Sequence, residues 1–343
     1  MTEESGAFTK PFESRPDLAD RFEILNALGE GAAGFVYRVR DKKRDNREVA
    51  LKVLANDSAF DEATLDRFLA ELKVCQKLRH ANIVEAYDLI EVGDTVAYTM
   101  EYVDGGSLQS IFAEKRIGYD AIDRIFEQVL DGVQALHDNG VVHRDIKLEN
   151  VLVRTDGIVK LTDLGLMKQV GQKGLTRPGI LLGTPQYMPP EYVKESVYDQ
   201  RGDIYTLGLM LYELLSGKRW LSNLRGQEVI THLLKTNFEI NRATLSGVPR
   251  KYLNVLARAL DARPERRYRS AAEMKADILE IPIDGRPLNN GPVVIESQVQ
   301  IKRFAPRWKP RHDAAHPLWF RLTLALLLGV SIAILLFALQ NKG

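Results

Sequence analysis

The residue types most able to do chemistry lie in two short stretches, residues 142–150 (VHRDIKLEN) and 162–165 (TDLG). Asp145 supplies a carboxylate that can accept a proton from a hydroxyl group, and Lys147 supplies a cation for a phosphate in transfer. Asn150 and Asp163 supply two oxygen ligands for a hard cation such as Mg²⁺. Together these residues predict a metal-assisted transfer of a phosphoryl group to a hydroxyl.

A glycine-rich run precedes both stretches. It comprises Gly29, Glu30, Gly31, Ala32, Ala33, Gly34, Phe35 and Val36. Glycine has no Cβ, so its backbone can approach phosphate oxygens closely. In dinucleotide-binding folds such glycines open a helix, whereas residues 35–39 continue here as a strand, which disfavours that alternative. A tight hairpin without a ligand remains the simpler alternative.

A lysine follows on the next apolar strand, at residues 49–52. Strand alternation sends Lys52 to the same side as Ala50, towards the glycine-rich run. A cation there can bind two phosphates, and Glu71 is the candidate carboxylate that would hold it. Ordinary surface positions are the alternatives for Lys52 and Glu71.

Two kinds of element are expected to position these residues. Residues 21–103 contain short β-branched and aromatic segments bounded by glycines and charged turns, which predict an antiparallel sheet. A helix is expected to interrupt it at residues 62–79, with the apolar stripe Leu65, Phe68, Leu69, Leu72 and Cys75. Helices dominate from residue 120, where one stripe comprises Ile122, Ile125, Phe126, Val129, Val133 and Leu136. Residues 203–216 are apolar nearly all round and predict a central buried helix.

The order and spacing of these motifs resemble the Ser/Thr branch of the protein kinase superfamily over residues 21–279. The resemblance implies an α+β, bilobal protein-kinase fold at residues 21–283. Its N-lobe (21–103) would hold an antiparallel β-sheet plus one helix, and its C-lobe (104–283) would be mainly helical. The implied phosphoryl donor is ATP with Mg²⁺, or Mn²⁺ in its place, and the acceptors are Ser/Thr hydroxyls of proteins. The resemblance assigns the catalytic roles to Asp145, Lys147, Lys52 and Glu71.

The resemblance also assigns an adenine pocket. Met100 looks like the gatekeeper, followed by a hinge whose backbone at Glu101 and Val103 would face the adenine edge. The side chains that would enclose the ring are Val36, Ala50 and Leu152.

Residues 183–191 look like the end of the activation segment. Thr184 would touch the catalytic aspartate and lysine, and Glu191 would pair with Arg267. Asp203 resembles the aspartate that anchors the catalytic-loop backbone from the central helix.

Four positions depart from the family pattern. Leu164 replaces the usual Phe, Pro189 the usual Ala and Leu148 the usual Pro, while Ala33 stands where an aromatic often caps the glycine loop. The last change bears on the rigidity of the loop. None of the four removes a reacting group.

Regulation is suggested by an arginine and a threonine. Arg144 precedes the catalytic aspartate, an arrangement that in the family awaits a phosphate on the activation loop. Thr176 is the only hydroxyl residue between residues 166 and 183, so it is the predicted phosphosite. An inert surface threonine is the alternative.

The C-terminal part predicts a membrane anchor. Residues 322–339 form an uncharged run of 18 residues, which residues 318–321 lengthen to a predicted transmembrane helix at 318–340 with a short tail at 341–343. A buried helix of a soluble core is the alternative. Positive charges are concentrated before the run, which predicts that the kinase part lies in the cytoplasm. Residues 1–20 are expected to be a flexible N-terminal segment without a secretory signal.

Residues 284–317 form a basic, Pro-containing linker that could contact anionic lipids, with plain solvation as the alternative. Small residues at a spacing of four, Ala325, Gly329 and Ala333, would allow close approach of two membrane helices and hence a homodimer.

Composition limits the remaining possibilities. The 343 residues carry a formal net charge of +1, which gives no sign of nucleic-acid binding, and Cys75 is the single cysteine, which excludes an intramolecular disulfide. Residues 1–300 hold 40 basic and 45 acidic residues, whereas residues 301–343 hold seven basic and one acidic. We therefore expect a mildly acidic catalytic body on a basic stalk, held as a single-pass protein in a membrane. Such an anchor is compatible with a bacterial inner membrane or a eukaryotic internal membrane, and a somewhat closer resemblance to bacterial members of the family favours the bacterial one.

Two other functions compete with a membrane-tethered Ser/Thr protein kinase. A pseudokinase scaffold would bind nucleotide without transferring phosphate, but it has no need of all four of Lys52, Asp145, Asn150 and Asp163. A small-molecule phosphotransferase on the same fold lacks support, because residues 183–191 resemble a segment that docks protein substrates.

Overall fold

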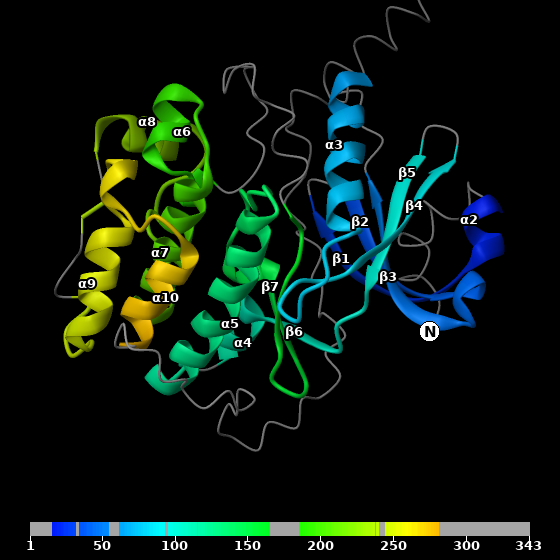
Figure 1. The fold of residues 1–343 in the computed structure, drawn as a ribbon, viewed down its shortest axis with the longest axis horizontal. Helices are drawn as coiled ribbons and strands as arrows, with labels where there is room; N and C mark the ends of the chain where they lie inside the picture. Colours follow the sequence, from blue (N-terminus) through cyan, green and yellow to red (C-terminus); the bar gives the residue numbers. More distant parts are fainter. Residues whose placement is uncertain are drawn as a thin grey trace, which may run out of the picture. The chain divides into compact units, whose positions relative to one another are not determined.

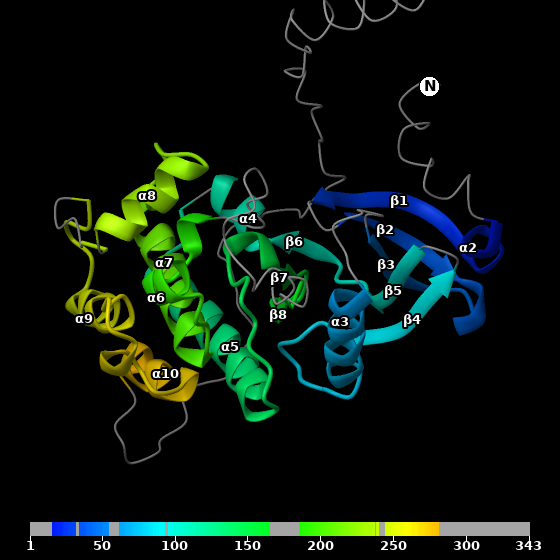
Figure 2. The same ribbon diagram turned by 90° about the horizontal axis from the view of Figure 1, so that it is seen from above.

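The computed structural model describes residues 16–31, 34–54, 62–92, 95–114, 116–164, 185–236, 238–239 and 244–280. The chain divides into two compact units, Met1–Phe304 and Ala305–Gly343, and every described residue belongs to the first. In that unit a β-rich lobe and a helical lobe lie side by side (Figures 1 and 2). The predicted bilobal arrangement of an antiparallel sheet and a helical lobe is confirmed.

The small lobe is built on a five-stranded antiparallel sheet. Its strands are β1 (Phe22–Gly31), β2 (Gly34–Asp41), β3 (Arg47–Leu54), β4 (Ala86–Val92) and β5 (Thr95–Glu101). They lie in the order β1-β2-β3-β5-β4, with the short 3-10 turn η1 (Lys42–Arg44) between β2 and β3. The register pairs Lys52 with Tyr98 and Ala50 with Met100, so the strand carrying the candidate lysine lies beside the strand that leads into the expected hinge.

One helix, α3 (Glu62–Cys75), packs on this sheet. Phe68, Leu72 and Cys75 of the predicted stripe are buried against β3 and β5, and Leu69 is partly buried there. The side chain of Leu65 lies outside the part of the chain that is described. The helix ends before the expected residue 79, because the chain tightens there into a turn in which Lys77 N–H donates to the Val74 carbonyl at 3.0 Å.

A second helix, α2 (Pro16–Arg21), lies at the N-terminal end of the described residues. Its Leu18 is only 1% exposed and joins the apolar cluster of Phe22 and Tyr37. Arg21 binds Asp41 at 2.6 Å, where the aspartate side chain is fully buried. Residues 16–20, expected to be flexible, are therefore part of the folded lobe, while residues 1–15 lie outside the described residues. One buried leucine and one arginine that pairs with two aspartates, Asp41 and Asp88, leave no periodic pattern in a six-residue helix.

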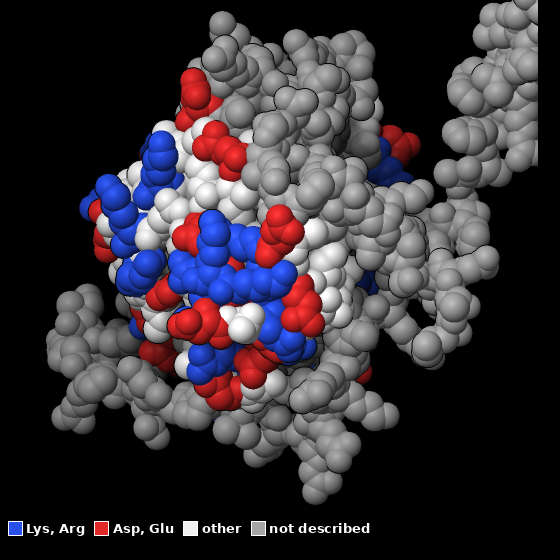
Figure 3. Space-filling model, turned by 90° about the vertical axis from the view of Figure 1, so that its right-hand side faces the viewer, with Lys and Arg blue, Asp and Glu red and all other residues white. Residues whose placement is uncertain are grey.

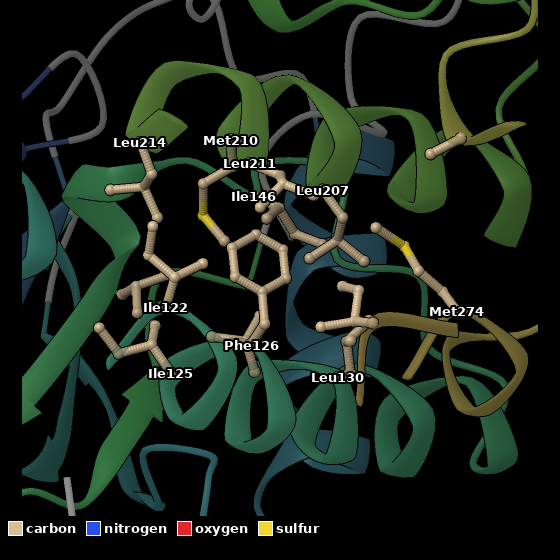
Figure 4. Close-up of a cluster of buried hydrophobic side chains, with 14 of the residues drawn as sticks. Ile122, Ile125, Phe126, Leu130, Ile146, Leu207, Met210, Leu211, Leu214 and Met274 are labelled. Atoms are coloured by element: carbon tan, nitrogen blue, oxygen red, sulfur yellow. The ribbon is translucent and has the colours of Figure 1, made fainter. Parts of the chain in front are cut away.

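The large lobe is built around α5 (Tyr119–Asp138) and α7 (Gln200–Ser216). All six residues of the predicted α5 stripe are buried, and α7 is buried from Gly202 to Ser216. Figure 4 shows Phe126 of α5 directed towards Leu207, Met210 and Leu211 of α7. The prediction of a central buried helix is thus confirmed.

The other elements of the large lobe surround this core. A three-stranded sheet comprises β6 (Gly105–Ser107), β7 (Val151–Arg154) and β8 (Val159–Leu161). The remaining helices are α4 (Leu108–Glu114), α6 (Pro190–Glu195), α8 (Gln227–Lys235), α9 (Arg250–Ala259) and α10 (Ala271–Leu279). Short 3-10 turns are η2 (Leu148–Asn150), η4 (Pro185–Tyr187) and η5 (Pro264–Arg266).

Charged side chains of both signs are interleaved on the face shown in Figure 3. Ion pairs within the small lobe fit this mixture, including Arg40 with Glu23 at 2.6 Å and Arg44 with Asp88 at 3.2 Å. Such exposed pairs contribute little to stability, so the lobe depends on its apolar clusters.

Across the described part of the chain, no helix is both long and apolar enough to cross a membrane. The predicted linker (284–317), transmembrane helix (318–340) and tail (341–343) all lie outside the described residues.

Candidate active site

The candidate proton acceptor lies in a loop that leads into η2. Lys147 Nζ lies 3.0 Å from Asp145 Oδ2, and the Asn150 amide donates to Asp145 Oδ2 at 2.9 Å and to the Asp145 carbonyl at 2.8 Å. The Asp145 and Lys147 side chains are mostly buried. The three residues therefore form one hydrogen-bonded group with the carboxylate at its centre.

The loop is anchored from below by Asp203 at the start of α7. Its fully buried carboxylate accepts the backbone N–H groups of His143 at 2.8 Å and Arg144 at 2.9 Å. His137 Nε2 lies 2.9 Å from the same carboxylate, and the Tyr198 hydroxyl donates to it at 3.1 Å. Burial opposes the charge on Asp203, but the bond to His137 and the other donors outweigh it, so the pKa of Asp203 is lowered.

Sequence reasoning missed His137 and Tyr198. His137 stands at the end of the apolar stripe of α5 and Tyr198 just before α7, so neither carries a pattern that marks it as a partner of a distant aspartate. Only the folding of α5 against α7 brings them together.

The candidate phosphate-binding lysine differs from expectation in its partner. Lys52 Nζ binds Asp163 Oδ1 at 2.5 Å across the two lobes, and no ion pair with Glu71 is present among the described residues. Burial favours the neutral form of Lys52, but Tyr98 and Asp163 outweigh it and raise its pKa. The pKa of Glu71 is raised by burial, an effect that Arg144 partly offsets. The apolar stripe of α3 fixes which face of this helix packs on the sheet. It does not determine which carboxylate binds the ammonium group of Lys52.

The glycine-rich run forms the hairpin between β1 and β2. Gly31 pairs with Gly34, whose φ of 127° is open to glycine but rarely to other residues, and the chain continues as β2. The run thus lies in a strand hairpin and opens no helix, which removes the dinucleotide-fold alternative. Ala32 and Ala33 lie outside the described residues.

Part of the expected adenine pocket is gathered in one apolar cluster. Ala50 and Met100 are buried there, with Val36 partly buried against them. Val103 is buried just after β5, and Leu152 lies half-buried on β7. The residues expected to form the hinge therefore follow Met100 of that cluster and precede β6, which pairs with β7.

Further along the chain, Arg267 binds Glu191 through two parallel bonds of 2.7 and 2.8 Å. The fully buried guanidinium also donates to the carbonyl groups of Asp261 and Arg201 and lies over the Tyr205 ring. This network secures the start of α6. Thr176 and Thr184 lie outside the described residues.

The donor set fits Mg²⁺. The side-chain amide nitrogen of Asn150 donates to Asp145, which leaves the side-chain amide oxygen available as a ligand. The backbone carbonyl of Asn150 accepts the N–H of Thr162, the residue before Asp163, at 3.0 Å. One carboxylate and one amide oxygen suit a cation that keeps several waters or phosphate oxygens. No larger cluster of His, Cys, Asp and Glu suitable for a metal occurs among the described residues.

These features agree with the comparisons with known proteins. Residues 22–278 match the family described as Protein kinase domain, and the chain belongs to that family. A protein kinase domain implies ATP and Mg²⁺ in general, together with protein substrates.

The relatives are bacterial serine/threonine-protein kinases. PknL of Mycobacterium tuberculosis is 34% identical over 262 residues, which cover 76% of this chain and 65% of PknL. PrkC of Bacillus subtilis is 31% identical over 290 residues, 84% of this chain and 44% of PrkC. This chain therefore matches less than two thirds of the length of either relative.

A solved structure gives the same fold. The kinase domain of Mycobacterium tuberculosis PknI, solved in a mutant form, aligns with a TM-score of 0.61 and 25% identity, over 76% of this chain and 94% of that one.

Proposed function

We propose that this protein is an ATP-dependent serine/threonine protein kinase. The observation that carries the proposal is the group formed by Asp145, Lys147 and Asn150, with Lys52 and Asp163 joined across the lobes. The names of the relatives support the same activity.

In the proposed reaction, a Ser or Thr oxygen of the protein substrate forms a bond to the γ-phosphorus of ATP while the bond from that phosphorus to the β-phosphate oxygen breaks. Asp145 orients the hydroxyl and accepts its proton. Lys147 stabilises the charge that develops on the phosphoryl oxygens, and Lys52 positions the phosphates of ATP. Asn150 and Asp163 would hold Mg²⁺, which supplies positive charge that neutralises phosphate oxygens.

Two variants test the activity. We expect Asp145→Asn and Lys52→Met to lose transfer of radiolabelled phosphate, both to the protein itself and to a basic protein substrate, by about 100-fold or more. Asp138→Asn, on the exposed end of α5, is the matched control and should transfer phosphate like the parent. Parent-like activity in Asp145→Asn would refute the assignment. A parent that binds ATP but transfers nothing would instead be the pseudokinase scaffold.

Activation by autophosphorylation on Thr176 is the regulatory part of the proposal. Thr176 is the only hydroxyl residue between residues 166 and 183, and Arg144 next to Asp145 is the cation expected to bind its phosphate. The intact mass of the parent should show added phosphate that peptide mapping assigns to Thr176 and that is absent from Asp145→Asn. Phosphate confined to other residues would contradict this site.

The membrane anchor, its lipid contacts, the homodimer and the bacterial inner membrane complete the proposal. The anchor, the lipid contacts and the homodimer are supported by the sequence of residues 284–340, and the choice of a bacterial membrane is supported by the bacterial relatives.

A further inference from the structure

A buried ion pair joins the large lobe to the hinge at a distance from the catalytic loop. Lys160 Nζ on β8 lies 2.8 Å from Glu101 Oε2 at the end of β5, with side chains only 8% and 17% exposed. Burying two charges is costly, and such a pair often contributes no more to stability than well-packed apolar residues would. Its position therefore suggests a role other than stability.

Three chain segments meet at this pair: residues 82–85, β8 and the end of β5. Leu161 N–H donates to the Asn82 carbonyl and Val84 N–H to the Leu161 carbonyl, each at 2.9 Å. The Asn82 amide also donates to the Val159 carbonyl at 2.9 Å. Residues 82–85 and β8 are thus firmly joined to each other.

The hinge is attached to this junction through both parts of Glu101. Its backbone N–H donates to the Glu85 carbonyl at 2.8 Å, and its side chain accepts from Lys160. Lys160 also reaches the Ile83 carbonyl at 3.4 Å. The large lobe therefore holds the residue whose backbone is expected to face adenine, through a lysine three residues before Asp163.

We propose that Lys160 is a positioning residue for nucleotide binding, which orients the hinge backbone at Glu101 towards the adenine edge. The proposal rests on the proposed function, because it takes the hinge to be the adenine site. Lys160 would therefore affect recognition of the adenine base and would take no part in the transfer of the phosphoryl group.

The test compares ligands with and without a base. In Lys160→Met, which keeps the apolar stem and removes the charge, Glu101 is left buried without its cation. We expect the KM for ATP and the Kd for ADP to rise about tenfold, with kcat changed less than about twofold. Inhibition by inorganic tripolyphosphate, which has no base, should be unchanged.

A double variant separates positioning from damage to the fold. Lys160→Met combined with Glu101→Gln removes both charges, so no unpaired charge remains. Because the bond that orients the hinge is still missing, we expect the ADP affinity to stay as low as in Lys160→Met. Recovery of the parent affinity would assign the loss to the unpaired charge of Glu101 and would overturn the inference. The control is Lys275→Met, which breaks the ion pair between Lys275 of α10 and Asp131 of α5. This variant should bind ADP like the parent.

Unchanged ADP affinity in Lys160→Met, or an equal loss for ADP and tripolyphosphate, would overturn the inference. If Lys160→Met does not fold, Glu101→Gln alone serves as the test, because it weakens the same ion pair and should also raise the Kd for ADP without changing inhibition by tripolyphosphate. A parent that transfers no phosphate would refute the proposed function, yet the ADP measurements would still decide the role of Lys160.

Discussion

At the scale of single residues, the candidate site holds two residues in an unusual backbone conformation: Arg144, next to Asp145, and Asp163 itself. Arg144 has φ of 62° and Asp163 has φ of 54°, in the left-handed region that costs a non-glycine residue about 1 kcal/mol or more. Asp203 accepts the N–H of Arg144 itself and that of His143 before it. The buried carboxylate therefore opposes the tendency of this strained segment to relax.

We predict that Asp203→Asn lowers the free energy of unfolding at pH 7 by about 3 kcal/mol, because an amide cannot replace a buried carboxylate that accepts several donors. The pKa of Asp203 is lowered in the folded state, so its stabilisation is present above the unfolded pKa and is lost as the pH falls through the folded one. The difference in the free energy of unfolding between parent and variant, measured with urea, should therefore begin to narrow as the pH falls below about 4.

The control for this measurement is Asp138→Asn, whose carboxylate lies exposed on α5 and, among the described residues, accepts only from Gln134 in the same helix. Its stability should stay within about 0.5 kcal/mol of the parent at every pH. A difference between parent and Asp203→Asn that stays constant down to about pH 3 would contradict the ionic role.

At the scale of elements, α2 extends the small lobe beyond the segment that matches the family. The match begins at residue 22, whereas Leu18 is buried in the cluster beneath β1, β2 and β3 and Arg21 binds the buried Asp41. The helix thus closes one end of the sheet with apolar and ionic contacts.

We predict that Leu18→Ala lowers the free energy of unfolding by about 2–4 kcal/mol, because it leaves a cavity among fully buried side chains. Thermal unfolding followed by circular dichroism would measure the effect. Leu234→Ala on α8 is the matched control, since Leu234 is 49% exposed and its loss should shift stability by less than about 0.5 kcal/mol. Equal melting temperatures for the parent and Leu18→Ala would mean that α2 does not support the lobe.

At the scale of the whole molecule, charge is divided unevenly along the chain. Residues 1–300 carry a slight excess of acidic residues, whereas residues 301–343 carry seven basic residues and one acidic. An acidic body is repelled by anionic lipid, and a basic segment is attracted to it. This division fits a catalytic domain held near a membrane by its C-terminal part.

We predict that deletion of residues 318–343 moves the protein from the membrane pellet to the supernatant after cell fractionation, because it removes the apolar run. Deletion of residues 341–343 alone, which leaves the run intact, should keep the protein in the pellet. If the longer deletion also stays in the pellet, the predicted anchor is wrong.

Much of the fold could be predicted because burial imposes a period on the sequence. The stripes that contain Phe68 in α3 and Phe126 in α5 were visible for this reason, and both of these side chains are buried. The stretch that forms α7 has no such period, and it was predicted because it is apolar nearly all round, as a buried helix is. The short helix α2 was not predicted, because a single buried residue gives no periodic pattern.

The sequence by itself determined which reactive groups this protein has and in what order, since the spacing around Asp145 and Asp163 reflects the chemistry they would share. Only the tertiary structure decided their partners: Lys52 binds Asp163 where Glu71 was expected, His137 supports Asp203, and Lys160 holds Glu101. The physical reason is that periodicity specifies the face of an element on which a side chain lies. Hydrogen bonds and ion pairs instead depend on distances of about 3 Å, which are set only when the elements pack together.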